Sequence, residues 1–395
     1  MAEGVAIIGA GLSGLTLALA LHQQGITPAV YESWQGPLKI GGATSVKVGS
    51  ILMSRRFKPP TATLLEVYEL GNKEKYGYPA NRIYRYELID LILSKVHAED
   101  IRVVYGHKFS HVVEETADYI TWQTEDGQML RASCLVGADG IHSSVRKYLY
   151  PHLVPKFTNM AGINASVPSV PVTHFGKKIS KALTIIARGV GAFIVAPQKV
   201  DGSELFIGKQ RRMEELSREG WEDFLADKES LVTFLQEDAQ VFGDIAVTST
   251  KIIDVTRMIV WPFYLVPELD RWSSVNRRVV ILGDAAHAIP PSAGLGISQA
   301  FEDVYAFALL LAASKKGMVS FEASLTFWQD YRQARVDKEL ELNKQVDLRR
   351  LPPNQAAGSD TQKIAKEDLE FTWLYSPSLK ADVDGWIKSV ASDNT

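Results

Sequence analysis

The N-terminal stretch GVAIIGAGLSGLTLALALHQQG, which begins at Gly4, constrains the fold most. The apolar run VAII predicts a buried strand, and the apolar-rich stretch that closes at Gly25 predicts a helix. Between them, Gly9, Gly11 and Gly14 form the pattern G-x-G-x-x-G. The first glycine permits the turn, the second lets a pyrophosphate approach the helix N-terminus, and the third lets helix and strand pack closely. This stretch predicts the start of a dinucleotide-binding domain.

An acidic residue strengthens this prediction. A second predicted strand, AVYE, ends in Glu32, about 20 residues after the first glycine. A carboxylate at that point accepts hydrogen bonds from a ribose diol and repels a 2′-phosphate, so the site should not prefer NADP. A glycine-rich turn in some other α/β fold is the alternative. The strand, the helix and the acidic residue, all in register, favour the dinucleotide site.

A second glycine-rich turn lies far along the chain, in VVILGDAAHAIPPSAGLGISQAFEDV from Val279 to Val304. The apolar run VVIL predicts a strand that ends in Gly-Asp. An aspartate at the end of a strand and the start of a glycine-rich turn usually holds a polar group, which makes Asp284 a candidate binding residue. His287 is interpreted as structural, because a histidine in a tight loop more often fixes that loop by hydrogen bonds than acts as a base.

Between the two turns, NRIYRYELIDLILSKV predicts a strand end that leads into an amphipathic helix. The runs IRVVYG, HVVEE and YITWQTEDGQML predict a β-meander, with a hairpin turn at EDGQ. The stretch ASCLVGADGIHSSVRKYL then predicts a strand that ends in a Gly-Ala-Asp-Gly turn. Cys134 in that strand is interpreted as a small buried hydrophobic residue.

The segment from Lys156 to Trp272 has a different pattern. Its short apolar or alternating runs AGINASV, ALTIIARG, GAFIVAPQ and ELFIGKQ predict an antiparallel sheet. A predicted helix pair, SREGWEDFLADKESLVTFLQEDA, and a returning strand, KIIDVTRMIVWPFYLVP, follow. We therefore predict a discontinuous first domain (1–155 and 273–350), an inserted domain (156–272) and a C-terminal helical segment (351–395).

Composition bounds the class of protein. The 395 residues are 46% hydrophobic and 23% charged, and the net charge of −3 comes without a basic block. This balance argues against nucleic acid or an anionic membrane as a partner. The single cysteine excludes an intramolecular disulfide and suits a reducing compartment. Because no targeting segment and no run of 18 apolar residues is visible, we expect a soluble, cytoplasmic protein without membrane insertion.

Four motifs together resemble the FAD-dependent aromatic-hydroxylase family of single-component (group A) flavoprotein monooxygenases. GAGLSG with Glu32 resembles its ADP-binding fingerprint, and RIYRYEL resembles the helix start whose arginine, here Arg85, contacts FAD. LVGADGIHSSVR, with Asp139, resembles the Asp-Gly motif associated with FAD and with the nicotinamide donor. LGDAAHAIPPSAGLG resembles the Gly-Asp motif, whose aspartate binds the flavin ribityl chain. The C-terminal stretch FTWLYSPSLKADVDGW is similar to the end of many fungal members.

The resemblance implies an α/β fold: a Rossmann-like FAD-binding domain with an inserted antiparallel-sheet substrate domain and C-terminal helices. It implies no metal site. Asp284 would bind the same FAD as the first turn, and the helix after the Gly-Asp loop would aim its N–H groups at the flavin. The family often has Gln and Asn where this chain has Leu295 and Ser298. The implied FAD contacts are Gly9, Gly11, Gly14, Glu32, Ala43, Arg85, Asp139, Asp284, Pro291, Gly294, Leu295, Gly296 and Ile297.

The family's chemistry implies that NADPH or NADH reduces FAD and that O₂ then forms a flavin C4a-hydroperoxide. This species would hydroxylate or epoxidise a small, largely hydrophobic substrate of aromatic, polyketide or alkaloid type; a Baeyer–Villiger outcome stays open. No separate nicotinamide-binding unit is visible, so the donor should bind transiently near the Asp-Gly motif. The protein's part is to orient the reactants and to supply a dry, polarised pocket.

The inserted sheet would cover the flavin and shape the substrate pocket. Among its residues, Arg188 is the candidate catalytic residue, because a cation in an apolar strand either reaches water or pairs with a substrate phenolate or carboxylate. The other candidates, each of which could simply be core, are Asn164, Phe193, Val195, Phe206 and Trp261.

Other functions share this fold. A flavin halogenase would need a tryptophan-rich motif that the sequence lacks, whereas a reductase of isoprenoid chains stays open. A non-catalytic binding protein of the Rab-escort or GDP-dissociation-inhibitor type shares the fingerprint, but the Gly-Asp motif argues against it. A yellow purified protein would favour an FAD enzyme.

Overall fold

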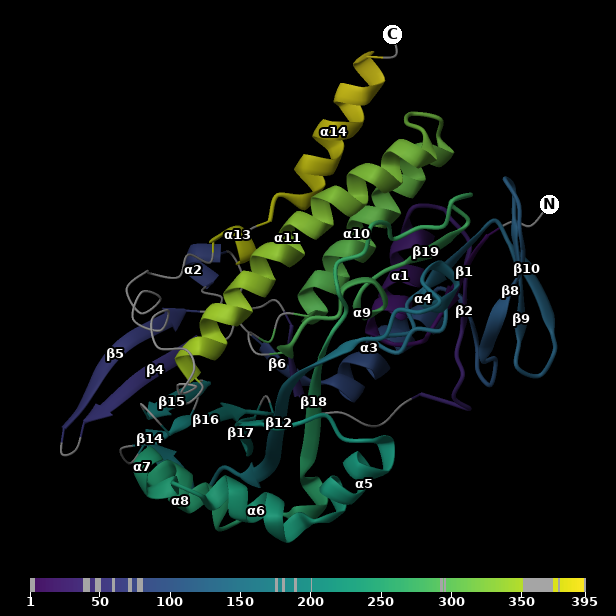
Figure 1. Ribbon diagram of the computed structural model, residues 1–395. Helices are drawn as coiled ribbons and strands as arrows, with labels where there is room; N and C mark the ends of the chain where they lie inside the picture. Colours follow the sequence, from purple (N-terminus) through teal and green to yellow (C-terminus); the bar gives the residue numbers. More distant parts are fainter. Residues whose placement is uncertain are drawn as a thin grey trace.

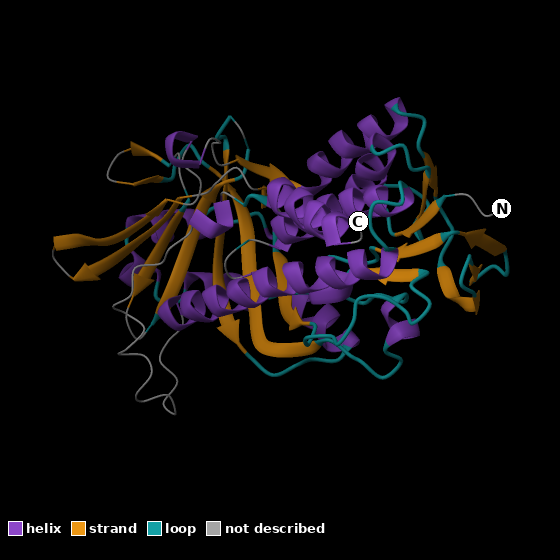
Figure 2. Ribbon diagram, turned by 90° about the horizontal axis from the view of Figure 1, so that it is seen from above, coloured by secondary structure: helices purple, strands orange, loops and turns teal. Residues whose placement is uncertain are grey.

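The fold is described from a computed structural model of the chain. It describes residues 4–37, 43–46, 51–58, 61–69, 73–76, 81–174, 177–179, 182–187, 190–199, 201–291, 294, 296–350, 372–375 and 377–393. A five-stranded parallel sheet and a seven-stranded mixed sheet organise the molecule, and Figure 2 shows them toward opposite ends with long helices lying across. The predicted α/β class, with a Rossmann-like domain, an antiparallel inserted sheet and C-terminal helices, is confirmed.

The parallel sheet has the strand order β19-β11-β1-β2-β7. Strands β1, β11 and β19 are fully buried along their length, as expected for a parallel sheet covered on both faces. Helices α1 (Leu12–Gln23) and α3 (Arg85–Ala98) bury one side of themselves in the same core. The strands are β1 (Val5–Ile8), β2 (Pro28–Tyr31), β7 (Arg102–Val104), β11 (Cys134–Gly137) and β19 (Val279–Ile281).

One predicted strand belongs to a different sheet from the one expected. The run IRVVYG was expected in the meander, but it forms β7, which pairs in parallel with β2 at the edge of the main sheet. Strand propensity is the same in both settings, so only tertiary pairing decides between them. The meander itself consists of β8 (Phe109–Glu115), β9 (Ile120–Thr124) and β10 (Met129–Ala132), and its predicted EDGQ hairpin turn is confirmed.

The second sheet has the order β18-β12-β17-β16-β15-β4-β5. Within the inserted segment every pairing is antiparallel, as predicted. Two strands from residues 51–69 extend this sheet, and β4 joins β15 in parallel. The domain boundaries stay a prediction, and these two strands come from the sequence of the first predicted domain. The strands are β4 (Ile51–Lys58), β5 (Thr61–Glu69), β12 (Lys156–Pro168), β15 (Leu183–Ala187), β16 (Gly191–Pro197), β17 (Glu204–Arg212) and β18 (Ile259–Leu265).

Helices cover one face of this sheet. In Figure 1, α5, α6, α7 and α8 lie below strands β12, β16 and β17. Because side chains alternate along a strand, Ile163, Phe193 and Ile207 point into the core shared with these helices. The opposite face carries Asn164 and Phe206; we call it the inner face of the sheet. The helices are α5 (Arg218–Ala226), α6 (Lys228–Gln236), α7 (Ala239–Phe242) and α8 (Asp244–Thr250).

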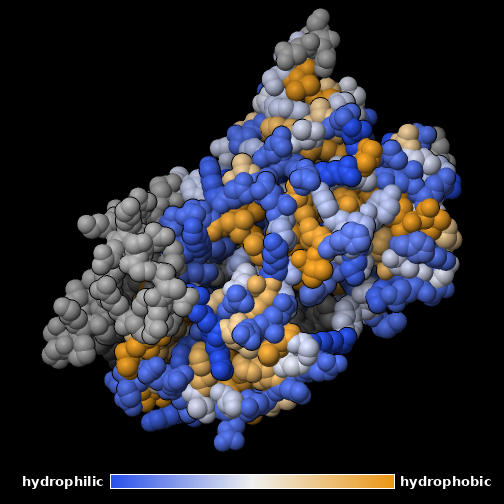
Figure 3. Space-filling model, viewed as in Figure 1, coloured by the Kyte–Doolittle hydropathy of each residue, from blue (hydrophilic) through white to orange (hydrophobic). Residues whose placement is uncertain are grey.

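Long helices complete the molecule. Helix α10 (Gly296–Lys315) is long and apolar enough to cross a membrane by composition, but 72% of its most apolar window is buried, where it packs against α1 and α11 (Phe321–Arg350). On the face drawn in Figure 3, hydrophobic patches are separated by hydrophilic residues. The remaining elements are α2 (Lys73–Tyr76), α4 (Arg146–Leu149), α9 (Asp284–His287), α13 (Thr372–Tyr375), α14 (Leu379–Asp393), the 3₁₀ turn η1 (Val255–Arg257) and the pairs β3 (Ala43–Val46) with β6 (Asn81–Tyr84) and β13 (Thr173–His174) with β14 (Lys177–Lys178).

Candidate active site

Three of the sequence motifs follow adjacent strands of the parallel sheet. Ile8 lies opposite Gly137, and Gly137 lies opposite Ile281, so β1, β11 and β19 end at the same level. The G-x-G-x-x-G turn, the Asp-Gly motif and the Gly-Asp motif begin just beyond these three ends. In open α/β sheets, ligands bind outside the carboxyl ends of the strands where the strand order reverses. Here that position lies between β1 and β11.

The first turn has the geometry of a phosphate site. Gly9 has φ of 107°, and a Cβ on Gly14 would lie 1.9 Å from the Gly9 carbonyl oxygen, so neither tolerates a side chain. A Cβ on Gly11, in contrast, would meet no atom within 4 Å. Helix α1 begins there without a side-chain cap and without an acidic residue in its first turn. Its first N–H groups therefore face open space that suits an anion.

Glu32 closes the same turn from β2. One carboxylate oxygen accepts a hydrogen bond from the Ala10 N–H at 2.7 Å, and the other accepts from the Trp34 N–H at 3.0 Å and the Ser33 hydroxyl at 2.9 Å. The partly buried carboxylate thus lies beside the glycine turn, at the edge where a ribose diol would meet it.

Asp139 has a largely local role in this structure. Its carboxylate accepts hydrogen bonds from the Ser143 hydroxyl at 2.5 Å and from the Ser144 and Val145 N–H groups at 2.7 and 3.2 Å. Burial raises the pKa of Asp139, and these hydrogen bonds partly oppose that rise. The carboxylate therefore shapes the Asp-Gly loop, and any contact with a cofactor is additional to that.

A residue that the sequence analysis did not single out links two motifs. Arg146 is 2% exposed, and its guanidinium donates to the Ala285 carbonyl at 2.9 Å and to the Ile141 carbonyl at 2.5 Å. It therefore fastens the Asp-Gly loop to the Gly-Asp turn. The sequence shows that Arg146 ends the stretch LVGADGIHSSVR, but it does not show that Arg146 contacts Ala285 in the Gly-Asp turn.

The Gly-Asp turn lies directly on the first turn. A Cβ on Gly283, which has φ of 58°, would lie 3.0 Å from the Ser13 hydroxyl oxygen, so the two glycine-rich turns are neighbours in space. Asp284 follows as the first residue of α9 and is exposed. Within the described part of the chain its carboxylate has no hydrogen-bond partner, which leaves its oxygens available to a ligand.

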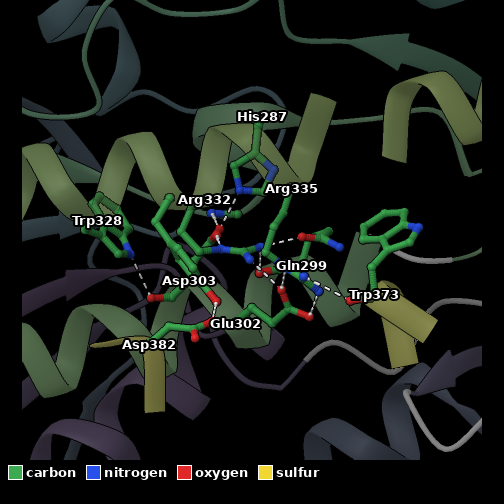
Figure 4. A network of polar contacts seen from close by, with 11 residues as sticks. His287, Gln299, Glu302, Asp303, Trp328, Arg332, Arg335, Trp373 and Asp382 are labelled. Atoms are coloured by element: carbon green, nitrogen blue, oxygen red, sulfur yellow. Dashed lines mark hydrogen bonds and ion pairs between the residues drawn. The ribbon is translucent and has the colours of Figure 1, made fainter. Parts of the chain in front are cut away.

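A buried polar network holds the Gly-Asp turn in place (Figure 4). Asp303 of α10 accepts from the Gly283 N–H at 2.9 Å, from Arg332 at 2.8 Å and from His287 at 2.5 Å. The His287 ring also packs against Trp272 in a tilted arrangement, with 4.9 Å between the ring centroids. Burial alone would raise the pKa of Asp303, but the charges of His287 and Arg332 outweigh it and lower that pKa. His287 is therefore structural, as expected.

For the other predicted FAD contacts and for Arg188, the structure gives the position in the fold or does not describe the residue. Ala43 pairs with Tyr84, so it lies beside the start of α3, where Arg85 is the first residue. Arg188 and Leu295 lie outside the described residues. The remaining predicted residues begin or precede α10: exposed Pro291, Gly294 with φ of 71°, Gly296, where a Cβ would meet nothing within 4 Å, and Ile297, which packs on the main core.

Two of the proposed pocket residues were wrong. Phe193 and Val195 are fully buried in the core beneath the sheet, because they alternate onto the face that α6, α7 and α8 cover. Asn164 and Phe206 share the inner face, since Asn164 lies opposite Gly208, two residues from Phe206. Trp261, opposite Gly162, is on the same face and is 44% exposed.

These residues fit an FAD. Open space over Gly11 at an uncapped helix start suits the pyrophosphate, Glu32 suits the adenosine ribose, and the unpaired carboxylate of Asp284 suits a hydroxyl of the same molecule. A parallel sheet with these turns along one carboxyl edge defines a dinucleotide-binding protein.

Comparisons with known proteins specify the family. Residues 96–341 match the family described as FAD binding domain. An FAD-dependent monooxygenase of Gibberella moniliformis is 24% identical over 98% of this chain and 97% of its own length. Salicylate hydroxylase of Pseudomonas putida is 24% identical over 96% and 93%. The crystal structure of CtdE in complex with FAD and substrate 4 superposes with a TM-score of 0.78, at 19% identity over 99% of both chains.

The chain belongs to this FAD-binding-domain family, within the aromatic-hydroxylase (group A) type of flavoprotein monooxygenases. It is an FAD-dependent monooxygenase, and the resemblance noted in the sequence is confirmed.

Proposed function

We propose that this monooxygenase uses NADPH or NADH and O₂ to hydroxylate or epoxidise a small, largely hydrophobic molecule of aromatic, polyketide or alkaloid type. We place this reaction in the cytoplasm, in keeping with a single, buried cysteine. The observation that carries the proposal is the meeting of the three strand-end motifs, with Gly283 packed on Ser13.

Bound FAD would supply the transfer of electrons from the nicotinamide to O₂ and the activation of oxygen. The chain's own residues would bind and orient. Gly11 and the α1 N-terminus would hold the pyrophosphate, Glu32 the adenosine ribose and Asp284 the ribityl chain. The remaining predicted contacts, among them Arg85 and Asp139, would complete the cofactor site. The inner face of the seven-stranded sheet would exclude water and receive the substrate.

The relatives reported above, a monooxygenase and a hydroxylase, support an oxygenase over a reductase or an escort-type binding protein. The test uses purified, yellow holoprotein and measures NADPH and NADH oxidation with and without a panel of phenols, indoles and polyketide aromatics. We expect that at least one compound stimulates oxidation and yields a product that is heavier by one oxygen atom. A colourless protein that does not take up added FAD would refute the proposal.

Arg188 remains the predicted catalytic residue, although it lies outside the described residues. It would pair with a phenolate or carboxylate of the substrate, a charge-assisted contact that the planar guanidinium makes best. Arg188→Ala should retain FAD but lose substrate-stimulated NAD(P)H oxidation or release hydrogen peroxide instead of product, and Arg188→Lys should be affected less. Coupled turnover that is unchanged in Arg188→Ala would show that the side chain does not bind the substrate and would favour the alternative, in which it reaches water.

A further inference from the structure

Two carboxamide side chains lie near each other on the inner face, on the neighbouring strands β12 and β17. Asn164 on β12 lies opposite Gly208 on β17, and Gln210 lies opposite Gly162, so the four residues share one face of the sheet. Asn164 is partly buried, and no hydrogen bond joins its amide to another side chain or backbone group in the described ranges. The Gln210 Oε1 is buried and likewise lacks a partner among the described residues. We call Asn164 and Gln210 the carboxamide pair.

The Asn164 amide lies over two glycines, Gly208 and Gly162. A Cβ on Gly208 would be 2.2 Å from the Asn164 Oδ1, and a Cβ on Gly162 would be 3.3 Å from the Asn164 Nδ2. Any larger residue at position 208 would displace the Asn164 amide. The sheet interior normally disfavours glycine, so two glycines under one amide indicate that the position of this amide is specific.

Aromatic side chains border the carboxamide pair. Half-buried Phe206 lies two residues before Gly208, and Trp261 lies opposite Gly162 with 44% of its surface exposed. Phe263 contacts Gly162 from β18. A planar substrate ring could pack against these aromatic side chains and form hydrogen bonds with the carboxamide pair.

We propose that the carboxamide pair binds a neutral amide or lactam group of the substrate, and that it selects such a substrate over one with a carboxylate at that position. The proposal rests on the proposed function, because it takes the inner face as the substrate side of the flavin. It names a specificity-determining pair for that reaction.

The chemistry of the pair favours a neutral amide. A carboxamide offers a donor and an acceptor, which complement the acceptor and the donor of an amide or lactam. Buried acceptor atoms such as the Gln210 Oε1 need an N–H or O–H donor, which a carboxylate cannot supply. The pair also carries no charge to offset a buried carboxylate. Among the described residues, a cation also lies beside this face, because the Arg82 guanidinium is 5.3 Å from the centre of the Phe206 ring.

Salicylamide and salicylate provide a matched pair of probes, since they differ only in carboxamide against carboxylate. The experiment titrates each probe into the FAD-loaded protein and follows the change in the flavin absorbance spectrum. We expect salicylamide to bind at least about tenfold more tightly than salicylate. Asn164→Leu and Gln210→Met, which keep the side-chain size, should each weaken salicylamide binding about five- to tenfold, the effect of one lost hydrogen bond.

Gly208→Ala should weaken salicylamide binding similarly, because the added methyl displaces the Asn164 amide while leaving it in the chain. Gly385→Ala in α14, where a Cβ meets nothing within 4 Å, is the matched control and should bind both probes as the unaltered protein does. All four variants should retain FAD.

Salicylate binding that equals or exceeds salicylamide binding would overturn the proposal, and its loss in Arg82→Met would assign the selectivity to Arg82. A salicylamide preference that survives in Asn164→Leu and Gln210→Met, or a loaded flavin that responds to neither probe, would also overturn it. These outcomes leave the proposed function intact if another compound stimulates NAD(P)H oxidation. Failure to load FAD would instead refute the proposed function itself.

Discussion

At the scale of single residues, the candidate site at the ends of β1, β11 and β19 depends on glycines that leave no room for a side chain. Gly14 has no room for a Cβ beside the Gly9 carbonyl, and Gly283 brings the second glycine turn against Ser13. The three predicted cofactor-binding carboxylates differ in their hydrogen bonds. Glu32 and Asp139 accept hydrogen bonds from protein groups, whereas the exposed Asp284 accepts none from the described residues. The cofactor should therefore depend most directly on Asp284.

Asp284→Ala should lower the affinity for FAD by about 1.5–3 kcal/mol, the range for a hydrogen bond to a charged group. Fluorescence titration of the apoprotein with FAD measures this loss. Asp223→Ala, on exposed helix α5, is the control and should leave affinity unaltered. Full-strength binding by Asp284→Ala would remove Asp284 from the cofactor site.

Cys134 should be unreactive in the folded protein. It is 3% exposed in β11, and burial raises the pKa of its thiol to about 12. Since the thiolate is the reactive form, a thiol reagent at pH 8 should label the protein only after denaturant unfolds it. Rapid labelling of the native protein would contradict the burial of β11.

At the scale of elements, the helices under the seven-stranded sheet are held by a cation that comes from the sheet. Lys209 of β17 is 7% exposed, and its ammonium donates to the carbonyls of Phe234 and Glu237 at 2.7 and 2.9 Å, at the C-terminus of α6. The ammonium also lies 4.4 Å from the centre of the Phe234 ring. A helix C-terminus favours a cation, so this contact fixes α6 against the sheet.

Lys209→Met keeps the aliphatic stem but leaves these two carbonyls without their donor. It should lower the free energy of unfolding by about 1.5–3 kcal/mol. Urea denaturation followed by circular dichroism measures the change, and exposed Lys251→Met at the end of α8 serves as the control. Equal stability of the two variants would mean that the contact does not support α6.

At the scale of the whole molecule, buried charges connect parts that the chain keeps far apart. The network around Asp303 joins the Gly-Asp turn to α10 and α11. A second cluster joins β6, β17 and η1: Arg257 donates to Glu204 at 2.5 Å and to the Tyr84 hydroxyl at 3.1 Å, and Tyr84 also contacts Glu204. Tyr84 directly precedes Arg85, so this cluster ties a predicted cofactor residue to strand β17 of the seven-stranded sheet.

Asp303 gives the molecule an acid-sensitive contribution to stability. Its pKa is lowered in the folded state, so its contribution is complete above the unfolded value of about 3.9 and is lost as pH falls through the folded pKa. Asp303→Asn should be less stable at pH 7 by about 1.5–3 kcal/mol, because the buried Arg332 loses one of its two carboxylate partners and keeps only Glu302. The gap to the unaltered protein should narrow below about pH 4.

Thermal unfolding between pH 7 and pH 3 measures that gap. Asp330→Asn, on the exposed side of α11, is the control and should follow the unaltered protein at every pH. A gap between Asp303→Asn and the unaltered protein that stays constant with pH would show that Asp303 does not stabilise the fold through its charge.

The sequence by itself determined the local elements and the family. Strands β1 and β11, helices α1 and α3, the EDGQ hairpin and the antiparallel inserted sheet followed from apolar periodicity and turn residues, which act over a few neighbours. Only the tertiary structure decided which sheet the run IRVVYG joins, and which face of β16 is covered; Phe193 and Val195 were misplaced for that reason. The contact of Arg146 with Ala285, and the place of Gln210 near Asn164, likewise depend on strand order and register, which join residues that no local pattern connects.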